Sequence, residues 1–214
     1  MKNNSFFIAE NGFSPIAIVF ALFILSTLMD IFLLEFITFA ALLAMLWMFR
    51  NPERVAPHFN DGAISSVADG EVIAIDNVDS CKYFDEPCLK IVIKKRVKDI
   101  ALLRAPFDSQ VSKIEKIVGA HLSLKSEKAR SLNDKTTVTF EKNSKKIVAE
   151  HIVEYGFQTI SVETIENKEI RQSSRYAFMN CGESTMYLPN SSRVSIKVGD
   201  ELSAGESLVG YFTT

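Results

Sequence analysis

Hydrophobic residues are concentrated in one long stretch near the start of the chain. Residues 14–49 read SPIAIVFALFILSTLMDIFLLEFITFAALLAMLWMF, and within them only Asp30 and Glu35 are charged. As one straight helix, these 36 residues would extend about 54 Å, whereas the hydrocarbon core of a bilayer is about 30 Å thick. The pattern therefore predicts a membrane anchor within residues 1–50, folded as a helical hairpin with arms at 15–29 and 36–49.

Charged residues around this hairpin predict its orientation. Lys2 precedes the apolar stretch and Arg50 and Arg54 follow it, whereas the two acids lie at the expected turn, residues 30–35. Basic flanks remain on the cytoplasmic side of a membrane. We therefore expect the soluble part on the cytoplasmic side of the membrane. Because each arm is close to the minimum length of a span, a re-entrant hairpin or one span plus an interfacial helix are alternatives.

The pattern changes to short alternating runs after Arg50. Residues 51–62 contain two prolines and a polar tail, which is typical of an extended linker. From 63 to 214, short runs rich in β-branched and aromatic residues alternate apolar and polar positions. They predict a mainly β domain, a sandwich or barrel. These runs are 71–76, 89–95, 136–142, 145–164 (as two strands), 184–189, 193–198 and 206–212.

Charge and cysteine content exclude several classes of protein. The net charge is -2, with no global basic character, so nucleic acid is not an expected partner. The three histidines are scattered and Cys81 and Cys88 lack metal-ligand spacing, so no metal site is expected. The odd number of cysteines, with Cys181 the third, favours free thiols in a reducing compartment over a disulfide framework.

One run of the β region is strongly basic. Residues 90–98 read KIVIKKRVK. This run could lie against anionic lipid. It could equally be a solvated edge strand that its lysines protect from pairing with other chains.

Four short motifs occur in a fixed order along the chain. They are Phe49-Arg50-Asn51-Pro52-Glu53-Arg54 with Pro57, then Ser66-Val67-Ala68-Asp69-Gly70, then Arg104-Ala105-Pro106, and finally Tyr187-Leu188-Pro189 with Val198-Gly199 and Ala204-Gly205-Glu206. In this order they resemble the Phe-Arg-x-Pro-x-Arg, Ser-Pro-Ala-Asp-Gly and His-Val-Asn-Arg-Ala-Pro motifs and the C-terminal tail of the short, bacterial-type phosphatidylserine decarboxylases.

The resemblance implies a specific chemistry. In the family, a Gly-Ser bond cleaves itself and leaves a pyruvoyl group, which is the cofactor for converting phosphatidylserine to phosphatidylethanolamine. An aspartate working with a histidine activates the serine, and a phospholipid membrane is the partner. Asp69 falls on the family aspartate, although Asp-Gly is also a common turn pair by itself.

The segment before Pro106 departs from the family at one candidate position and matches it at another. Ala101 stands where the family has its histidine, and alanine cannot transfer a proton. Arg104 matches the family and would bind a substrate phosphate or carboxylate. The alternative role for Arg104 is structural, at the edge of a strand.

The cleavage site departs further. Counting forward from Arg175 places the Gly-Ser pair on Gly182-Glu183, and counting back from Tyr187 places it on Cys181-Gly182. Ser184 is the nearest serine, and a one-residue insertion would move the cut to the bond between Glu183 and Ser184. Glycine reaches backbone conformations that glutamate does not, so this cut would be harder.

These departures lead to three hypotheses about function. The first is a phosphatidylserine decarboxylase-related membrane protein of phospholipid metabolism with impaired or lost self-processing, which stays uncut at 24.0 kDa. The alternative is an active pyruvoyl-dependent decarboxylase that uses Ser184 and Asp69. The third is a membrane-tethered β module of unrelated function. A homo-oligomer is compatible with all three.

Overall fold

The computed structural model describes residues 7–54, 62–155 and 159–213. The chain separates into two compact units, Met1–Glu53 and Arg54–Thr214. The predicted flanking charge Lys2, motif residue Pro57 and most of the predicted linker lie outside the described residues.

The first unit is a pair of helices, α1 (Glu10–Leu28) and α2 (Phe32–Met48). The start of α1 and the end of α2 lie together, because the Ala9 backbone N–H donates to the Phe49 carbonyl oxygen at 2.9 Å. The turn is shorter than predicted, and Glu35 lies inside α2. Asp30 adopts a left-handed conformation with φ 56°. Because aspartate tolerates this conformation, the chain reverses there without a glycine.

The two helices present apolar side chains outward and hydroxyl groups inward. Ser26 and Thr38 are buried between the helices, with their oxygens 3.3 Å apart. Large apolar side chains such as Phe36 are exposed. Among the described residues, α1 is the one helix both long and apolar enough to cross a membrane, with 19 residues and a mean hydropathy of 1.8. α2 is apolar but has 17 residues.

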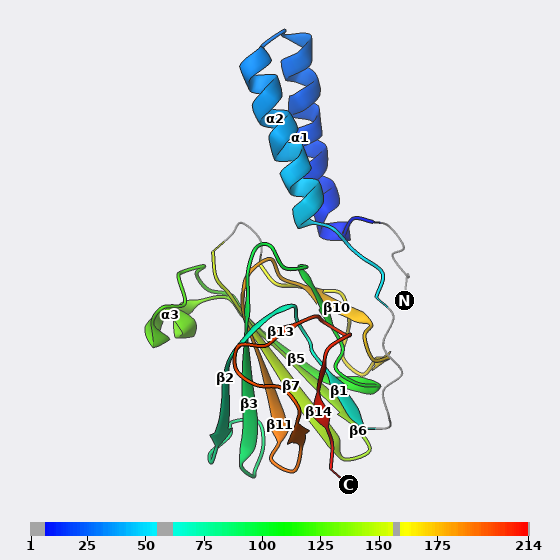
Figure 1. The fold of residues 1–214 in the computed structure, drawn as a ribbon, viewed down its shortest axis with the longest axis vertical. Coiled ribbons are helices and arrows are strands. Elements are labelled where there is room, and N and C mark those ends of the chain that lie inside the picture. Colours follow the sequence, from blue (N-terminus) through cyan, green and yellow to red (C-terminus); the bar gives the residue numbers. More distant parts are fainter. Residues whose placement is uncertain (1–6, 55–61, 156–158, 214) are drawn as a thin grey trace. The chain divides into compact units, whose positions relative to one another are not determined.

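The second unit is built on a curled, eight-stranded antiparallel sheet that forms a half-barrel (Figure 1). Along the sheet the strands follow the order β13-β2-β3-β11-β7-β6-β5-β9. These strands are β13 (Glu201–Leu202), β2 (Gly70–Val78), β3 (Cys88–Lys95), β11 (Gly182–Pro189), β7 (Lys145–Val153), β6 (Lys135–Lys142), β5 (Ser109–Ile117) and β9 (Glu169–Ile170).

Two small sheets and one short helix complete this unit. The first sheet pairs β1 (Ala63–Ser65), β14 (Leu208–Tyr211) and β12 (Arg193–Val194), and the second pairs β4 (Leu102–Arg104), β10 (Arg175–Phe178) and β8 (Ser161–Val162). The helix α3 (Glu127–Leu132) lies in the connection from β5 to β6. Apolar side chains from all three sheets form a single buried core, which includes Ile64, Ile93, Phe140, Tyr176 and Val209.

The prediction of a mainly β domain is confirmed, but the basic run is misplaced as an edge strand. β3 lies between β2 and β11, inside the large sheet. Its basic side chains serve internal contacts: Lys94 pairs with Glu154, and Lys95 is buried. The strands β5 and β10 were not predicted from the sequence, and only the first two residues of the run 193–198 form a strand.

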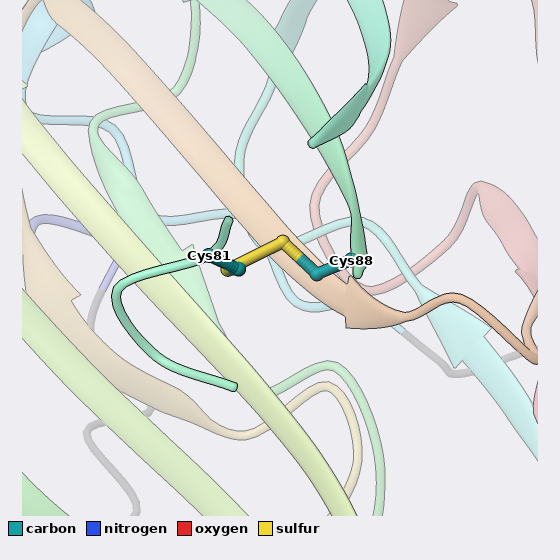
Figure 2. Close-up of a disulfide and its surroundings, with 2 residues drawn as sticks. All are labelled: Cys81 and Cys88. Carbon is teal, nitrogen blue, oxygen red and sulfur yellow. A yellow bond between two sulfur atoms is a disulfide. The ribbon is translucent and has the colours of Figure 1, made fainter. Parts of the chain in front are cut away.

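The expectation that Cys81 and Cys88 are free thiols is wrong in this structure. The two form a disulfide, with Cα atoms 6.0 Å apart, across the connection between β2 and β3 (Figure 2). The odd number of cysteines did not indicate this disulfide. The hairpin of β2 and β3 brings the two residues within disulfide distance. Cys181 is free and buried, as expected.

We predict that the disulfide stabilises the β unit. The two cysteines are seven residues apart, and closing so short a loop should contribute about 2.5 kcal/mol by restricting the unfolded chain. Changing both Cys81→Ser and Cys88→Ser should therefore lower the melting temperature of the full-length protein by about 5–10 °C. Circular dichroism in detergent measures this change.

The control is a reducing agent, which should lower the melting temperature of the unmodified protein and leave the double variant unchanged. Equal melting temperatures for the oxidised protein and the double variant would contradict a stabilising role.

Candidate functional site

Four neighbouring strands bring polar side chains to the core-facing side of the large sheet. Lys95 on β3, Ser184 on β11 and His151 on β7 share the face of their strands that carries the core residues. Asp69 directly precedes β2 on the far side of β3. All four are buried. Buried polar groups are rare unless they are paired, so this cluster is the candidate site.

The centre of the cluster is a chain of three hydrogen-bonding side chains. Ser184 and His151 are direct cross-strand partners, and Ser184 Oγ lies 2.9 Å from His151 Nδ1. On the other side of the imidazole, His151 Nε2 lies 2.6 Å from the Tyr176 hydroxyl of β10. A serine hydroxyl is thus joined to an imidazole whose orientation a third group fixes, as in nucleophilic sites.

Burial determines the protonation of these three side chains. Desolvation and the nearby positive charge of Lys95 lower the pKa of His151 to about 3, and desolvation raises the pKa of Tyr176 well above its ordinary value. The imidazole is therefore neutral near pH 7. In one tautomer Ser184 donates its proton to Nδ1, which leaves the imidazole able to act as a base. In the other tautomer Nδ1–H donates to Ser184.

Asp69 is engaged by a different partner. Arg54 donates two hydrogen bonds to its carboxylate, at 2.5 and 2.7 Å, and the Ala204 backbone N–H donates a third at 2.8 Å. Burial alone would raise the pKa of Asp69, but these donors outweigh it and lower the pKa below its ordinary value. Asp69 thereby joins two motifs of the sequence, at Arg54 and at Ala204.

Gly182 and Glu183 occupy the start of β11. Gly182 has φ 146°, and a Cβ there would collide with the Ile152 carbonyl oxygen of β7. The close strand approach therefore requires glycine at 182, whatever its chemical role.

The Glu183 side chain points to the opposite face of the sheet from Ser184. Arg130 of α3 donates two hydrogen bonds to its carboxylate, at 2.9 and 3.0 Å, and Lys94 lies 3.7 Å away. This carboxylate lines an open cleft of about 440 Å³ together with Arg130 and Thr185.

The remaining predicted site residues lie in the interior. Arg104 is buried and donates to the Ser173 carbonyl oxygen at 2.9 Å, a contact that fits its structural alternative. Ala101 is buried too. The Lys95 ammonium donates to the carbonyl oxygen of Ile100, the residue before Ala101, so a cation lies beside the position of the family histidine.

His151, Tyr176 and Lys95 were not identified as site residues from the sequence. The alternation of apolar and polar positions in residues 145–153 could have identified His151. Ile147, Ala149 and Val153 face the core, and His151 lies on the same face of the strand. A histidine at a core position of a strand needs a buried hydrogen-bond partner.

The Arg54–Asp69 pair yields a prediction about stability and pH. Asp69→Asn should lower the free energy of unfolding at pH 7 by about 3–5 kcal/mol, because the buried Arg54 guanidinium loses its bidentate carboxylate and keeps only the more exposed Glu206, 3.4 Å away. The pKa of Asp69 is lower in the folded than in the unfolded protein, so its contribution is present above about pH 3.8 and is lost as pH falls through the folded pKa.

Urea unfolding at pH 7 and again near pH 2 measures this effect. The difference between the original protein and Asp69→Asn should shrink at the lower pH. Glu115→Gln is the control, because Glu115 pairs with Lys113 at the surface and should contribute little. A difference of equal size at both pH values would contradict this account of Asp69.

Comparisons with known proteins agree with the motif order. A sequence profile of the family "Phosphatidylserine decarboxylase" matches residues 42–210. The chain is 31% identical to the phosphatidylserine decarboxylase proenzyme of Syntrophus aciditrophicus over 99% of this chain and 100% of that protein. It is 32% identical to the proenzyme of Desulfotalea psychrophila over 82% of this chain and 84% of that protein. For the proenzyme of Burkholderia mallei, identity is 26% over 94% of each chain. The chain belongs to the phosphatidylserine decarboxylase family.

Proposed function

We propose that this chain is a phosphatidylserine decarboxylase proenzyme that cleaves itself between Glu183 and Ser184. The observation that carries the proposal is the 2.9 Å contact between Ser184 Oγ and His151 Nδ1. Loss of processing was expected because Ala101 replaces the family histidine and because no serine falls on the counted cleavage position. A neutral imidazole beside Ser184 offers another base for the same proton.

The first step of the proposal is an acyl shift. Ser184 Oγ attacks the Glu183 carbonyl carbon while its proton passes to His151 Nδ1. The C–N bond then breaks and an ester to Oγ forms, with the proton returning from His151 to the departing amide nitrogen. Because the pKa of His151 is lowered to about 3, its protonated form readily gives its proton to that nitrogen, whereas its neutral form is a weak base for the first transfer.

The second step is an elimination. The Ser184 Cα–H proton is lost, the Cβ–O bond breaks, and Glu183 leaves as the carboxylate end of the N-terminal fragment. Water then replaces the nitrogen at position 184, and ammonia is released. The pyruvoyl group so formed supplies an electron sink for decarboxylation of a serine headgroup.

Neighbouring residues fit such a product. Arg130 and Lys94 hold the Glu183 side chain, so they would keep the new chain end in place after the cut. Lys95 would place a positive charge close to the carboxylate that is released. Position 184 would remain between β3 and β7 because the rest of β11 stays paired.

A second candidate function is an uncut relative that keeps the fold and binds lipid. The observation in its favour is Glu183, which stands where the family cleaves after glycine. In addition, Ser184 lies within a strand that is paired on both sides. The backbone is held in place there, so only rotation of the Ser184 side chain can bring its Oγ to the Glu183 carbonyl carbon.

The two candidates differ in the mass of the purified protein. If the chain cleaves itself, it should be converted over hours to days into two fragments, residues 1–183 and 184–214. Ser184→Ala should stay whole, and His151→Gln should cut slower by a factor of about 10²–10⁴, because it removes the base. Mass spectrometry of samples taken over time follows both fragments.

Thr185→Ala is the matched control, since it removes the adjacent hydroxyl from the opposite face of β11 and should cut at the original rate. A chain that stays whole for days and releases no CO₂ from phosphatidylserine would favour the uncut relative. Equal rates for His151→Gln and the original protein would exclude His151 as the base.

We also propose that α1 and α2 anchor the protein in the inner membrane, with the β unit on the cytoplasmic side. Arg50 at the open end of the hairpin and the acids near its turn support this orientation. Fusion of reporter proteins after residue 13 and after residue 214 should both report a cytoplasmic location. Opposite locations would indicate a single crossing.

The cysteines provide an independent test of which side of the membrane the β unit occupies. In a reducing cytoplasm, the partly exposed Cys81 should react with a permeant alkylating agent in intact cells, because the disulfide should form only after oxidation. Cys88 is fully buried, so the readout is Cys81 alone. Complete protection from alkylation in cells would place the β unit on the oxidising side of the membrane.

A further inference from the structure

The connection between β5 and β6 carries an exposed apolar surface. We call residues 118–134 the docking loop, which includes α3. Val118 is 86% exposed, Leu132 50% and Leu122 46%, and Ile117 just before the loop is 57% exposed. Isolated exposed apolar residues are ordinary, but a contiguous group marks a contact surface.

Backbone contacts hold these side chains together. The Ala120 N–H donates to the Leu132 carbonyl oxygen at 2.8 Å, which joins the two ends of the loop. The Leu122 N–H donates to the Asn133 side-chain oxygen at 3.0 Å, which brings Leu122 beside Leu132. The backbone at Gly119 also approaches the Leu132 carbonyl oxygen closely, so the segments that carry these exposed apolar residues lie side by side, and we call these residues the patch. In this part of the fold α3 projects from the margin of the sheet (Figure 1).

The loop is rigid at its base. Asp134 accepts hydrogen bonds from the Gly119 N–H at 2.5 Å and contacts His121 Nε2 at 2.8 Å. The Asn133 amide donates to the carbonyl oxygens of Leu122 and Val153 at 2.7 and 2.8 Å. Because the loop is already ordered, binding to a partner does not carry the entropy cost of ordering it.

Charge around the patch points to an anionic partner. Within residues 115–132 the exposed charged residues are Lys116, Lys125 and Lys128, against Glu115 and Glu127, so lysines outnumber acids. Exposed apolar side chains interspersed with lysines are the pattern of a segment that enters the boundary between headgroups and acyl chains of an anionic bilayer. Since the chain also carries an apolar helical unit, a bilayer is the partner that both features share.

The loop also contacts the candidate site. Arg130 lies within α3 and binds Glu183, the residue before Ser184. Movement of α3 at a lipid surface would therefore reach β11 through one ion pair.

We propose that the docking loop of the β unit inserts into the surface of an anionic bilayer, as a second membrane contact in addition to the N-terminal helices. The proposal does not depend on self-cleavage, so it stands or falls separately from the proposed function.

The test uses the full-length protein in vesicles of phosphatidylglycerol and phosphatidylcholine. A polarity-sensitive fluorophore is attached through Val118→Cys, without reductant, so that the disulfide and the buried Cys181 stay unlabelled. Doxyl-labelled phosphatidylcholine in the same vesicles quenches a fluorophore that enters the bilayer. Val198→Cys is the matched control, because Val198 is a valine of the β unit with 57% exposure.

We expect the probe at 118 to shift to the blue and to be quenched roughly threefold or more, as for a side chain 5–10 Å inside the interface, with little change at 198. Lys125→Gln with Lys128→Gln should weaken docking, by about fivefold for each lysine. Equal, weak quenching at both positions would overturn the proposal. A blue shift at 118 without lipid quenching would also overturn it, because another protein surface would then cover the loop.

Discussion

The site depends on the pairing of β11 with a strand on each side. Because β3 and β7 hold β11 in register along most of its length, each of its side chains faces a predetermined partner. This constraint places Ser184 opposite His151 and turns Glu183 to the other face, toward Arg130. The core then excludes water from Ser184 and His151, which keeps the imidazole neutral and its hydrogen bonds strong.

The same constraint explains why Asp69 and Ser184 have separate roles in this structure. β3 lies between their strands, and Asp69 is fully occupied by Arg54 and Ala204. Asp69 therefore acts here as a structural junction between the start and the end of the β unit. Lys95, on the intervening strand, influences the protonation of both Asp69 and His151.

Much of the fold could be predicted from the sequence, because its apolar periodicities are strong. The hairpin and the strands around 71–76, 89–95 and 136–142 follow directly from them. β5 was missed because a register shift between Val111 and Lys113 places its apolar residues Val111 and Ile114 three positions apart, which breaks the alternation of a strand. The turn at Asp30 was drawn too long because an aspartate, not a glycine, takes the left-handed conformation.

The candidate site was less predictable, because it depends on long-range pairing. Motif order located Asp69 and Ser184, but only strand register brings His151 to Ser184. Similarly, Cys81 and Cys88 became partners through a hairpin, not through their number. Matching the motifs position by position finds Ala101 and Glu183 in place of family residues, but it gives no information on His151, which reaches Ser184 from another strand.

The most direct measurement of the central claim is the chemical identity of residue 184 in the aged, purified protein. Reduction with labelled borohydride followed by peptide mass analysis detects a carbonyl group there. The account predicts a C-terminal fragment that begins at position 184 with a reducible, blocked end. An intact Glu183–Ser184 peptide with no label at 184 would contradict it.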